Sequence, residues 1–305
     1  MNVLQPIEIT SALIGAGATL AEDPTPAWVS GTTYTVGTEV HVVSTHRVYK
    51  DAVGGVSTVS PNLDDGTRWV DIRPTNRMAP FDIYTSTAAT STTTDIVYPI
   101  TARFVNAIAL YGLVGLSYDI TVKDVAGGTV IWQRSGTLKR HDKGWFNYLF
   151  GRRTQLRKLV FFGLPMRPAA EITVTISSTG ANQRAVGMIA MGKLRPLMGA
   201  LPGGTEVGAS AEPVSYSYIK QNEDGTTKIV RRHSGTNLKC RVFIQQSQAD
   251  NAVNILQDVL DIPVAWIATE TEGYAGLSTF GIASSTPVQY QTPHAYIDIN
   301  VRGLI

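Results

Sequence analysis

Short runs of β-branched and aromatic residues, bounded by glycine-containing turns, recur along the whole chain and constrain its fold more than any other feature. In one run Tyr118, Ile120 and Val122 alternate with polar residues. Because successive side chains of a strand point to opposite faces, this alternation predicts a half-buried strand. Many such strands in succession predict a mainly β protein with a two-sheet sandwich or jelly roll.

The chain has 305 residues, which exceeds one average hydrophobic core and predicts several domains. A proline-rich linker at residues 23–26 and changes in composition suggest the boundaries. One helix is expected near 248–260, where apolar residues recur with helical spacing before Pro263. We predict an N-terminal extended arm at 1–24, a small β-module at 25–75, a jelly-roll or β-sandwich domain at 76–195, and a β-rich C-terminal domain at 196–305.

The composition is that of an ordinary globular protein. Hydrophobic residues make up 43%, charged residues 16%, and the formal net charge is +2. The single cysteine, Cys240, excludes an intramolecular disulfide and is expected to be buried. No segment reaches the roughly 18 apolar residues of a membrane-spanning helix. Residues 11–21 lack the preceding basic residues of an export signal.

Catalytic motifs are not recognisable in this sequence. It contains no nucleophile elbow, phosphate-binding glycine loop or dinucleotide fingerprint in its required context. The histidines are dispersed, and His41 and His46 have a spacing that places them on opposite faces of a strand. Acidic pairs sit in turn-like segments rather than in a recognisable glycosidase arrangement. We predict that the protein is not an enzyme and holds no metal or cofactor.

Four aromatic residues punctuate the segment from Pro26 to Ile72: Trp28, Tyr34, Tyr49 and Trp69. Exposed rings on a rigid strand platform can stack on the C–H face of a sugar. The spacing of these rings resembles that of small chitin- and cellulose-binding modules. The resemblance implies carbohydrate binding by the four rings, with hydrogen bonds from Asp64, Asp65 and Arg68. A module of about fifty residues has little core, so the alternative that Trp28 and Trp69 fill that core stays open.

A basic segment interleaved with aromatic residues spans residues 139–158. It contains seven Lys or Arg residues and one acidic residue. Tryptophan, tyrosine and arginine are favoured in subunit interfaces, whereas basic and aromatic residues together can also follow a nucleic-acid backbone. We favour a subunit interface over nucleic-acid binding, and a solvated loop remains possible. The predicted interface residues are Lys139, Arg140, Trp145, Tyr148, Arg152 and Arg153.

Several further segments are similar to those of tail proteins of double-stranded DNA bacteriophages. Residues 7–10, 19–22 and 28–34 resemble the opening of many phage structural proteins, and residues 69–82 resemble the passage from a sugar-binding-like module into a jelly roll. Residues 105–110, Trp266 and Phe280 with Gly281 fit later domains of the same family. In this chain Arg73 stands where a glycine is usual, and residues 78–80 replace an aromatic-containing run.

The resemblance implies a structural component of a virion tail tip or baseplate. Such a protein would contact other tail proteins, form a homo-oligomer around the tail axis, and present its module to a host surface glycan. Repetition around the axis would turn weak single-site binding into avidity. One alternative is a purely structural tail subunit whose module makes only subunit contacts. Another is a non-catalytic part of a secreted polysaccharide-degrading enzyme.

Overall fold

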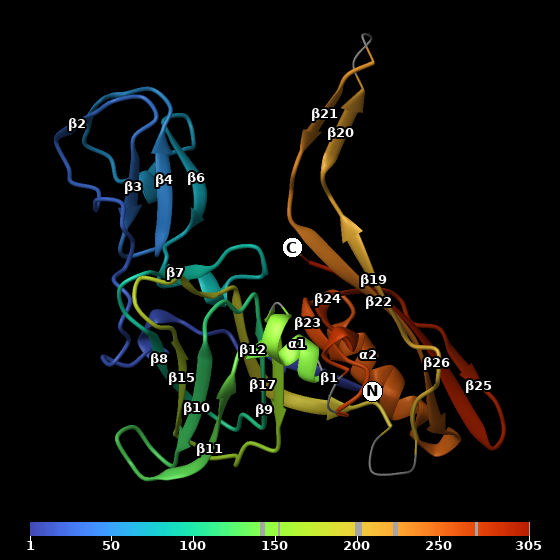
Figure 1. Cartoon of the computed structure of the whole chain (residues 1–305). Coiled ribbons are helices and arrows are strands. Elements are labelled where there is room, and N and C mark those ends of the chain that lie inside the picture. Colours follow the sequence, from blue (N-terminus) through green and yellow to red (C-terminus); the bar gives the residue numbers. More distant parts are fainter. Residues whose placement is uncertain (141–143, 152, 199–202, 222–224, 272–273, 305) are drawn as a thin grey trace.

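The computed structural model describes residues 1–140, 144–151, 153–198, 203–221, 225–271 and 274–304, and it confirms a mainly β fold. Strands account for 49% of the chain and helical residues for 10%. A small lobe, a sandwich, a C-terminal part and a projecting two-stranded arm are visible in Figure 1.

The largest element is an eleven-stranded sheet. Its main path runs β14-β9-β17-β1-β23-β24-β26-β22-β18, with β19 also paired to β22 and β25 to β26. The strands are β1 (Asn2–Pro6), β9 (Ala107–Tyr111), β14 (Lys158–Phe162), β17 (Met188–Pro196), β18 (Gly204–Thr205), β19 (Ser210–Ser215), β22 (Ser234–Gln245), β23 (Val264–Ile267), β24 (Ser278–Ser285), β25 (Val288–Tyr290) and β26 (His294–Gly303).

The N-terminal residues are an internal strand of this sheet, which differs from the predicted extended arm. β1 pairs antiparallel with β17 on one side and with β23 on the other. Val3 and Leu4 are fully buried, on opposite faces. β1 therefore joins the sequence regions that we placed in separate domains, and the sheet continues across the predicted boundary at 195/196.

A four-stranded antiparallel sheet packs against one end of the large sheet. It consists of β8 (Ile96–Ala102), β10 (Ser117–Lys123), β11 (Val130–Thr137) and β15 (Ala170–Ser177). Its buried residues, including Ile120 and Val174, share a core with Ile108 and Leu110 of β9. The intervening β9 residues Ala107 and Ala109 enter a second core on the other face. This alternation produces the predicted two-sheet sandwich.

The predicted C-terminal helix is confirmed as α2 (Ala249–Val259). Ala252, Leu256 and Val259 lie on its apolar face and pack in a core with Val3 and Trp266. A second helix, α1 (Trp145–Phe150), was not predicted from the sequence. Cys240 is buried, as expected.

The small lobe contains a three-stranded and a two-stranded sheet. The first is β3 (Glu39–Val42), β4 (Arg47–Asp51) and β6 (Trp69–Pro74); the second is β2 (Thr32–Tyr34) and β5 (Gly55–Ser57). We call residues 25–75 the module. Two further strand pairs are short: β7 (Ala89–Ser91) with β16 (Arg184–Val186), and β12 (Lys139–Arg140) with β13 (Thr154–Gln155).

A two-stranded arm extends away from the rest of the chain (Figure 1). It is formed by β20 (Tyr218–Gln221) and β21 (Thr227–Val230), which pair only with each other. Short 3-10 turns complete the description: Ser11–Leu13, Pro61–Leu63, Ala79–Phe81, Gln246–Gln248 and Ala275–Leu277.

Candidate functional site

The aromatic rings of the module point into its core rather than into solvent. Tyr34 and Tyr49 are each 8% exposed, and Trp69 is 2% exposed. Tyr34 meets Trp69 edge to face, with ring centroids 5.3 Å apart. Trp28 is partly buried against the same cluster. The four rings therefore supply the core that a module of this size needs.

The polar ends of these rings also have partners inside the module. The indole N–H groups of Trp28 and Trp69 each donate to Ser57 Oγ at 3.2 Å. The Tyr34 hydroxyl donates to the carbonyl oxygen of Val29 and accepts from the Val29 amide. Buried indole and phenol groups are stable only when their polar atoms are bonded in this way.

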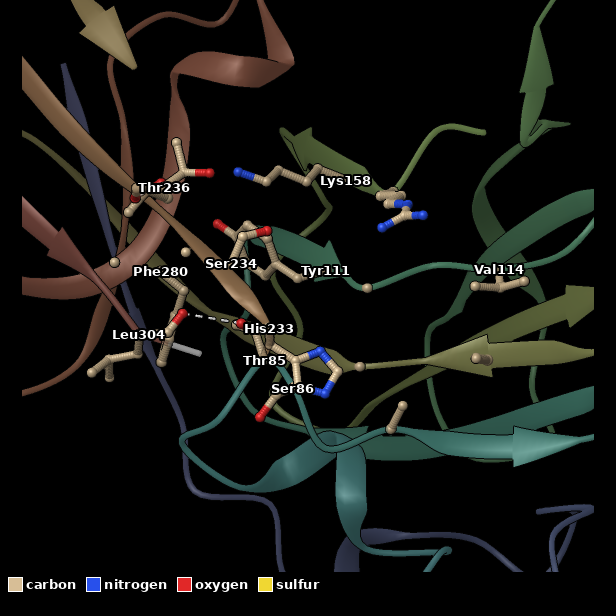
Figure 2. A pocket seen from close by; sticks show the side chains of 18 of the residues that line it. Thr85, Ser86, Tyr111, Val114, Lys158, His233, Ser234, Thr236, Phe280 and Leu304 are labelled. Carbon is tan, nitrogen blue, oxygen red and sulfur yellow. Dashed lines mark hydrogen bonds between the residues drawn. The ribbon is translucent and has the colours of Figure 1, made fainter. Parts of the chain in front are cut away.

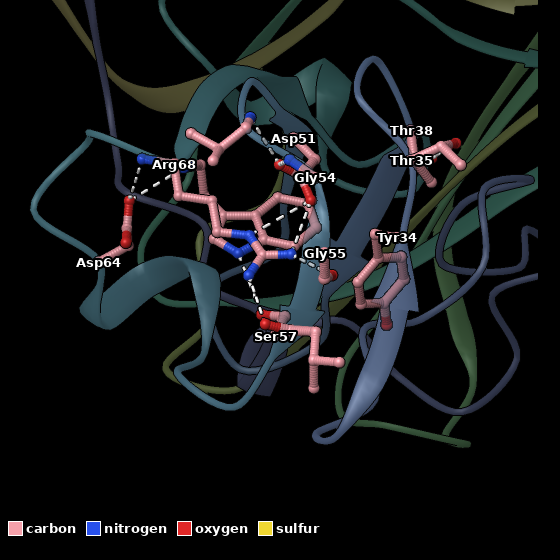
Figure 3. Close-up of polar contacts among 12 residues, drawn as sticks. Tyr34, Thr35, Thr38, Asp51, Gly54, Gly55, Ser57, Asp64 and Arg68 are labelled. Carbon is pink, nitrogen blue, oxygen red and sulfur yellow. Dashed lines mark hydrogen bonds and ion pairs between the residues drawn. The ribbon is translucent and has the colours of Figure 1, made fainter.

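The predicted sugar-binding polar residues are engaged in the same fold (Figure 3). Arg68 forms an ion pair with the buried Asp51 at 2.9 Å and donates to the carbonyl oxygens of Gly55 and Val56. Asp64 accepts from three backbone amides between residues 66 and 69. Asp65 is exposed and accepts from the Thr67 amide, and hydrogen bonds with Thr67 lower its pKa.

These contacts correct the predicted stacking site. A ring whose faces are covered by the core offers no face to a sugar, so the stacking role predicted for Tyr34, Tyr49 and Trp69 is wrong. Arg68 and Asp64 hold the chain of the module in place. Of the predicted set, Asp65 and the exposed part of Trp28 remain on the surface.

A buried carboxylate fastens the module where the chain enters and leaves it. Asp23 accepts two hydrogen bonds from Arg73, at 2.6 and 3.1 Å, and others from Thr25 and the Asn76 amide. Burial alone would raise the pKa of Asp23, but these hydrogen bonds outweigh it and lower the pKa to about 2. The predicted linker at residues 23–26 is thus a bonded junction.

The short helix α1 exposes four large apolar side chains. Trp145 is 75% exposed, Phe146 60%, Leu149 62% and Phe150 70%. Their spacing places them on one side of the helix, and the ring of Phe146 contacts those of Trp145 and Phe150. We call these four residues the aromatic patch.

The aromatic patch lies within the predicted subunit interface. Lys139 and Arg153 flank the aromatic patch in the sequence and are exposed, and Trp145 within the patch is exposed too. Arg152, and the side chains of Arg140 and Tyr148, lie outside the described residues. The interface itself stays a prediction.

The arm is exposed on both faces. Ile219 pairs across the strands with Ile229, and Tyr218 pairs with Val230 on the opposite face. These four side chains are between 40% and 66% exposed. On the face of Tyr218, Lys220 stands directly opposite Lys228. Like charges at this position repel one another, and a two-stranded ribbon in water is marginally stable.

A groove lined mainly by apolar residues lies beside the start of the chain. It encloses about 210 Å³. Ile83 and Ile262 on its wall are 50% and 42% exposed. Glu8 and Asp82 are the acidic residues among its described lining. Burial raises the pKa of Asp82 despite hydrogen bonds from Thr87 and Tyr84.

A cavity of about 370 Å³ lies between the sandwich and the C-terminal strands (Figure 2). Its ionisable lining residues are cationic or neutral, and none of the described ones is Asp or Glu. Arg157 and Lys158 come from the start of β14, and His233 from the segment before β22. The hydroxyl-bearing residues that line it are Thr85, Ser86, Thr90, Tyr111, Ser234, Thr236 and Thr279. We call this the basic cavity.

The basic cavity could not be predicted from the sequence because its walls come from seven separate segments of the chain. Lys158 and Arg157 fall inside the basic segment noted in the sequence, but their neighbours Thr85 and His233 are more than seventy residues away in either direction. Only the folded sheet brings them together.

The described residues contain no group of three His, Cys, Asp or Glu side chains placed to hold a metal ion. None of the described helices is long and apolar enough to cross a membrane. His41 and His46, weighed above as a metal pair, bond instead to the carbonyl oxygen of Thr25 and to the Glu22 carboxylate.

Comparisons with known proteins identify no family. No protein-family model matches the sequence, and no significant match was found among curated proteins or solved structures.

Proposed function

We propose that this chain is a non-enzymatic structural subunit that assembles with further copies of itself. The observation that carries the proposal is the arm, because every residue of β20 and β21 is exposed while both faces bear paired apolar side chains. A ribbon of this kind gains stability when a neighbouring surface covers it. The aromatic patch offers a second apolar surface of the same kind.

The groove on a neighbouring copy fits the arm in chemistry. Apolar walls would receive Tyr218 and Val230, while Asp82 and Glu8 would face Lys220 and Lys228 on the same face of the arm. Asp82 forms no ion pair with another described residue, so an incoming lysine would relieve the cost of its burial. An arm in the groove of the next copy is a head-to-tail contact, which closes into a ring or continues as a filament.

The sequence resemblance to tail-tip and baseplate proteins suggests that this assembly belongs to a phage virion tail. The buried rings favour the purely structural version of that role over sugar stacking by the module, whose outer surface would then contact neighbouring subunits.

Light scattering after size-exclusion chromatography tests the assembly. We expect the full chain to elute as an oligomer and the Tyr218→Ser/Val230→Ser variant to shift toward monomer. A matched control, Val130→Ser, removes an equally exposed apolar side chain from the edge strand β11. An unaltered elution of the arm variant, or a monomeric wild-type protein, would count against the proposal.

A further inference from the structure

The basic cavity contains a lysine in an unusual electrostatic position. Lys158 projects from β14 into the space between the two halves of the chain, as Figure 2 shows. Its ammonium donates to the carbonyl oxygen of Ser278 at 2.9 Å. No carboxylate of the described residues pairs with it, whereas eight other Lys or Arg side chains in the same residues form ion pairs.

An ammonium has three N–H donors, and a carbonyl oxygen satisfies one of them. Removing a charge from water without an opposite charge is costly, and burial lowers the pKa of Lys158 accordingly. Arg157 and His233 line the same cavity and add positive or potentially positive charge. The cavity therefore favours an anionic group beside Lys158.

The rest of the cavity surface favours a ligand rich in hydroxyl groups. Seven Ser, Thr and Tyr residues line it, and such side chains both donate and accept hydrogen bonds. Its volume of about 370 Å³ falls within the ordinary range of small-molecule sites. The hydroxyls of Thr85, Tyr111 and Thr279 already hydrogen-bond within the fold. An inorganic ion would leave those of Ser86, Thr90, Ser234 and Thr236 without a partner among the described residues.

Two glycines that line the cavity pack closely against each other through their backbones. Gly112 has a φ of +67°, and a Cβ there would stand 2.9 Å from the Cα of Gly187. The hydroxyl of the neighbouring Tyr111 bonds to Ser278 Oγ at 3.0 Å. Tyr111 and Ser278 are buried, so they fix the carbonyl group that orients Lys158.

We propose that the basic cavity binds an acidic saccharide, whose carboxylate or phosphate group pairs with Lys158 and Arg157 while its hydroxyl groups bond to the lining Ser and Thr residues. This site is separate from the module and from the arm. It goes beyond the proposed assembly role, because binding of a sugar in the cavity does not require the arm to find a partner.

Isothermal titration with four probes tests the site: glucuronic acid, glucose 6-phosphate, glucose and inorganic phosphate. We expect binding of one or both acidic sugars with a Kd on the order of 1 mM or tighter, and at least about tenfold weaker binding of glucose. The two acidic sugars distinguish a carboxylate from a phosphate ligand. Phosphate binding as tight as that of glucose 6-phosphate, or the absence of binding by both acidic sugars, would overturn the proposal.

Variants locate the binding within the chain. Lys158→Met keeps the length of the side chain and removes its charge, and Arg157→Gln alters an exposed residue that leaves the core intact. We expect each substitution to weaken binding of the acidic sugar by about tenfold or more. Lys50→Met, an exposed lysine of β4, serves as the control and should bind like the wild type. If all three variants bind the acidic sugar as tightly as the wild type does, the ligand binds elsewhere and the proposal is contradicted.

Discussion

The Lys158 ammonium donates to the carbonyl oxygen of Ser278. This bond joins β14, at one end of the large sheet, to β24 in the C-terminal part of the chain. No carboxylate among the described residues pairs with this lysine, and burial lowers its pKa. A buried lysine without a paired carboxylate lowers the stability of the folded chain, and destabilising residues of this kind are typical of binding sites.

We therefore predict that Lys158→Met leaves the thermal unfolding temperature unchanged or raises it, although the variant loses a hydrogen bond. Differential scanning calorimetry without ligand measures this, with Lys50→Met as control. A fall of more than about 5 °C, which corresponds to roughly 3 kcal/mol in a chain of this size, would mean that the lysine is structural.

The same lysine predicts a pH dependence on the alkaline side. Burial lowers the pKa of Lys158 below its ordinary value of 10.5, so the unfolded chain binds more protons between the folded and unfolded pKa values. This contribution to the free energy of unfolding increases as pH rises through that window. Chemical denaturation at pH 8 to 10.5 should show a smaller alkaline loss of stability for the wild type than for Lys158→Met. Parallel pH profiles would contradict the assignment.

The ion pair of Asp23 with Arg73 predicts an acid-sensitive junction. Because hydrogen bonds depress the pKa of Asp23 to about 2, its contribution to stability is present above pH 4 and is lost as pH falls toward 2. Asp23→Asn should destabilise the folded chain by about 3 kcal/mol, since it leaves Arg73 without its charge partner. Urea denaturation at pH 7 measures the loss. Asp65→Asn, an exposed turn acid, is the control and should cost far less.

The module core predicts that its tryptophans differ in their effect on folding. Trp69→Ala should cost about 3–5 kcal/mol and unfold the module, because this ring is almost fully buried. Trp28→Ala should cost less, since part of its ring is exposed. Limited proteolysis of residues 25–75 monitors the module directly. A folded Trp69→Ala module that loses only sugar binding would support a stacking platform instead.

The aromatic patch predicts a second contact between subunits. Phe146→Ser/Phe150→Ser should weaken self-association by about tenfold or more, while circular dichroism stays unchanged because both rings are exposed. Sedimentation equilibrium measures the association constant. An association constant like that of wild type would remove the patch from the interface.

The strands were predictable because their alternation is local in sequence, and α2 because its apolar residues recur before Pro263. Helix α1 was missed because it has only six residues, and fewer than two turns give too short a helical repeat to recognise. The place of β1 depends on partners more than 180 residues away, which no local pattern records.

The orientation of the module's rings could not be read from spacing either. Trp69 lies on β6 and Ser57 on β5, which belong to different sheets of the module, and their contact shows that the ring is part of the core. Arg73 stands where a glycine is usual in the phage tail proteins that the sequence resembles. In this chain the arginine has a structural reason, because it forms an ion pair with Asp23.

Disulfide cross-linking tests the proposed contact between the arm and the groove of a neighbouring copy most directly. The native Cys240 suits this design because it is buried, and burial raises its pKa to about 11, which keeps it unreactive. Two single variants, Lys220→Cys and Ile83→Cys, are mixed and oxidised. We predict a cross-linked heterodimer in high yield, and a low yield when Lys50→Cys replaces Ile83→Cys. Equal yields from the two mixtures would contradict the arm-in-groove assembly.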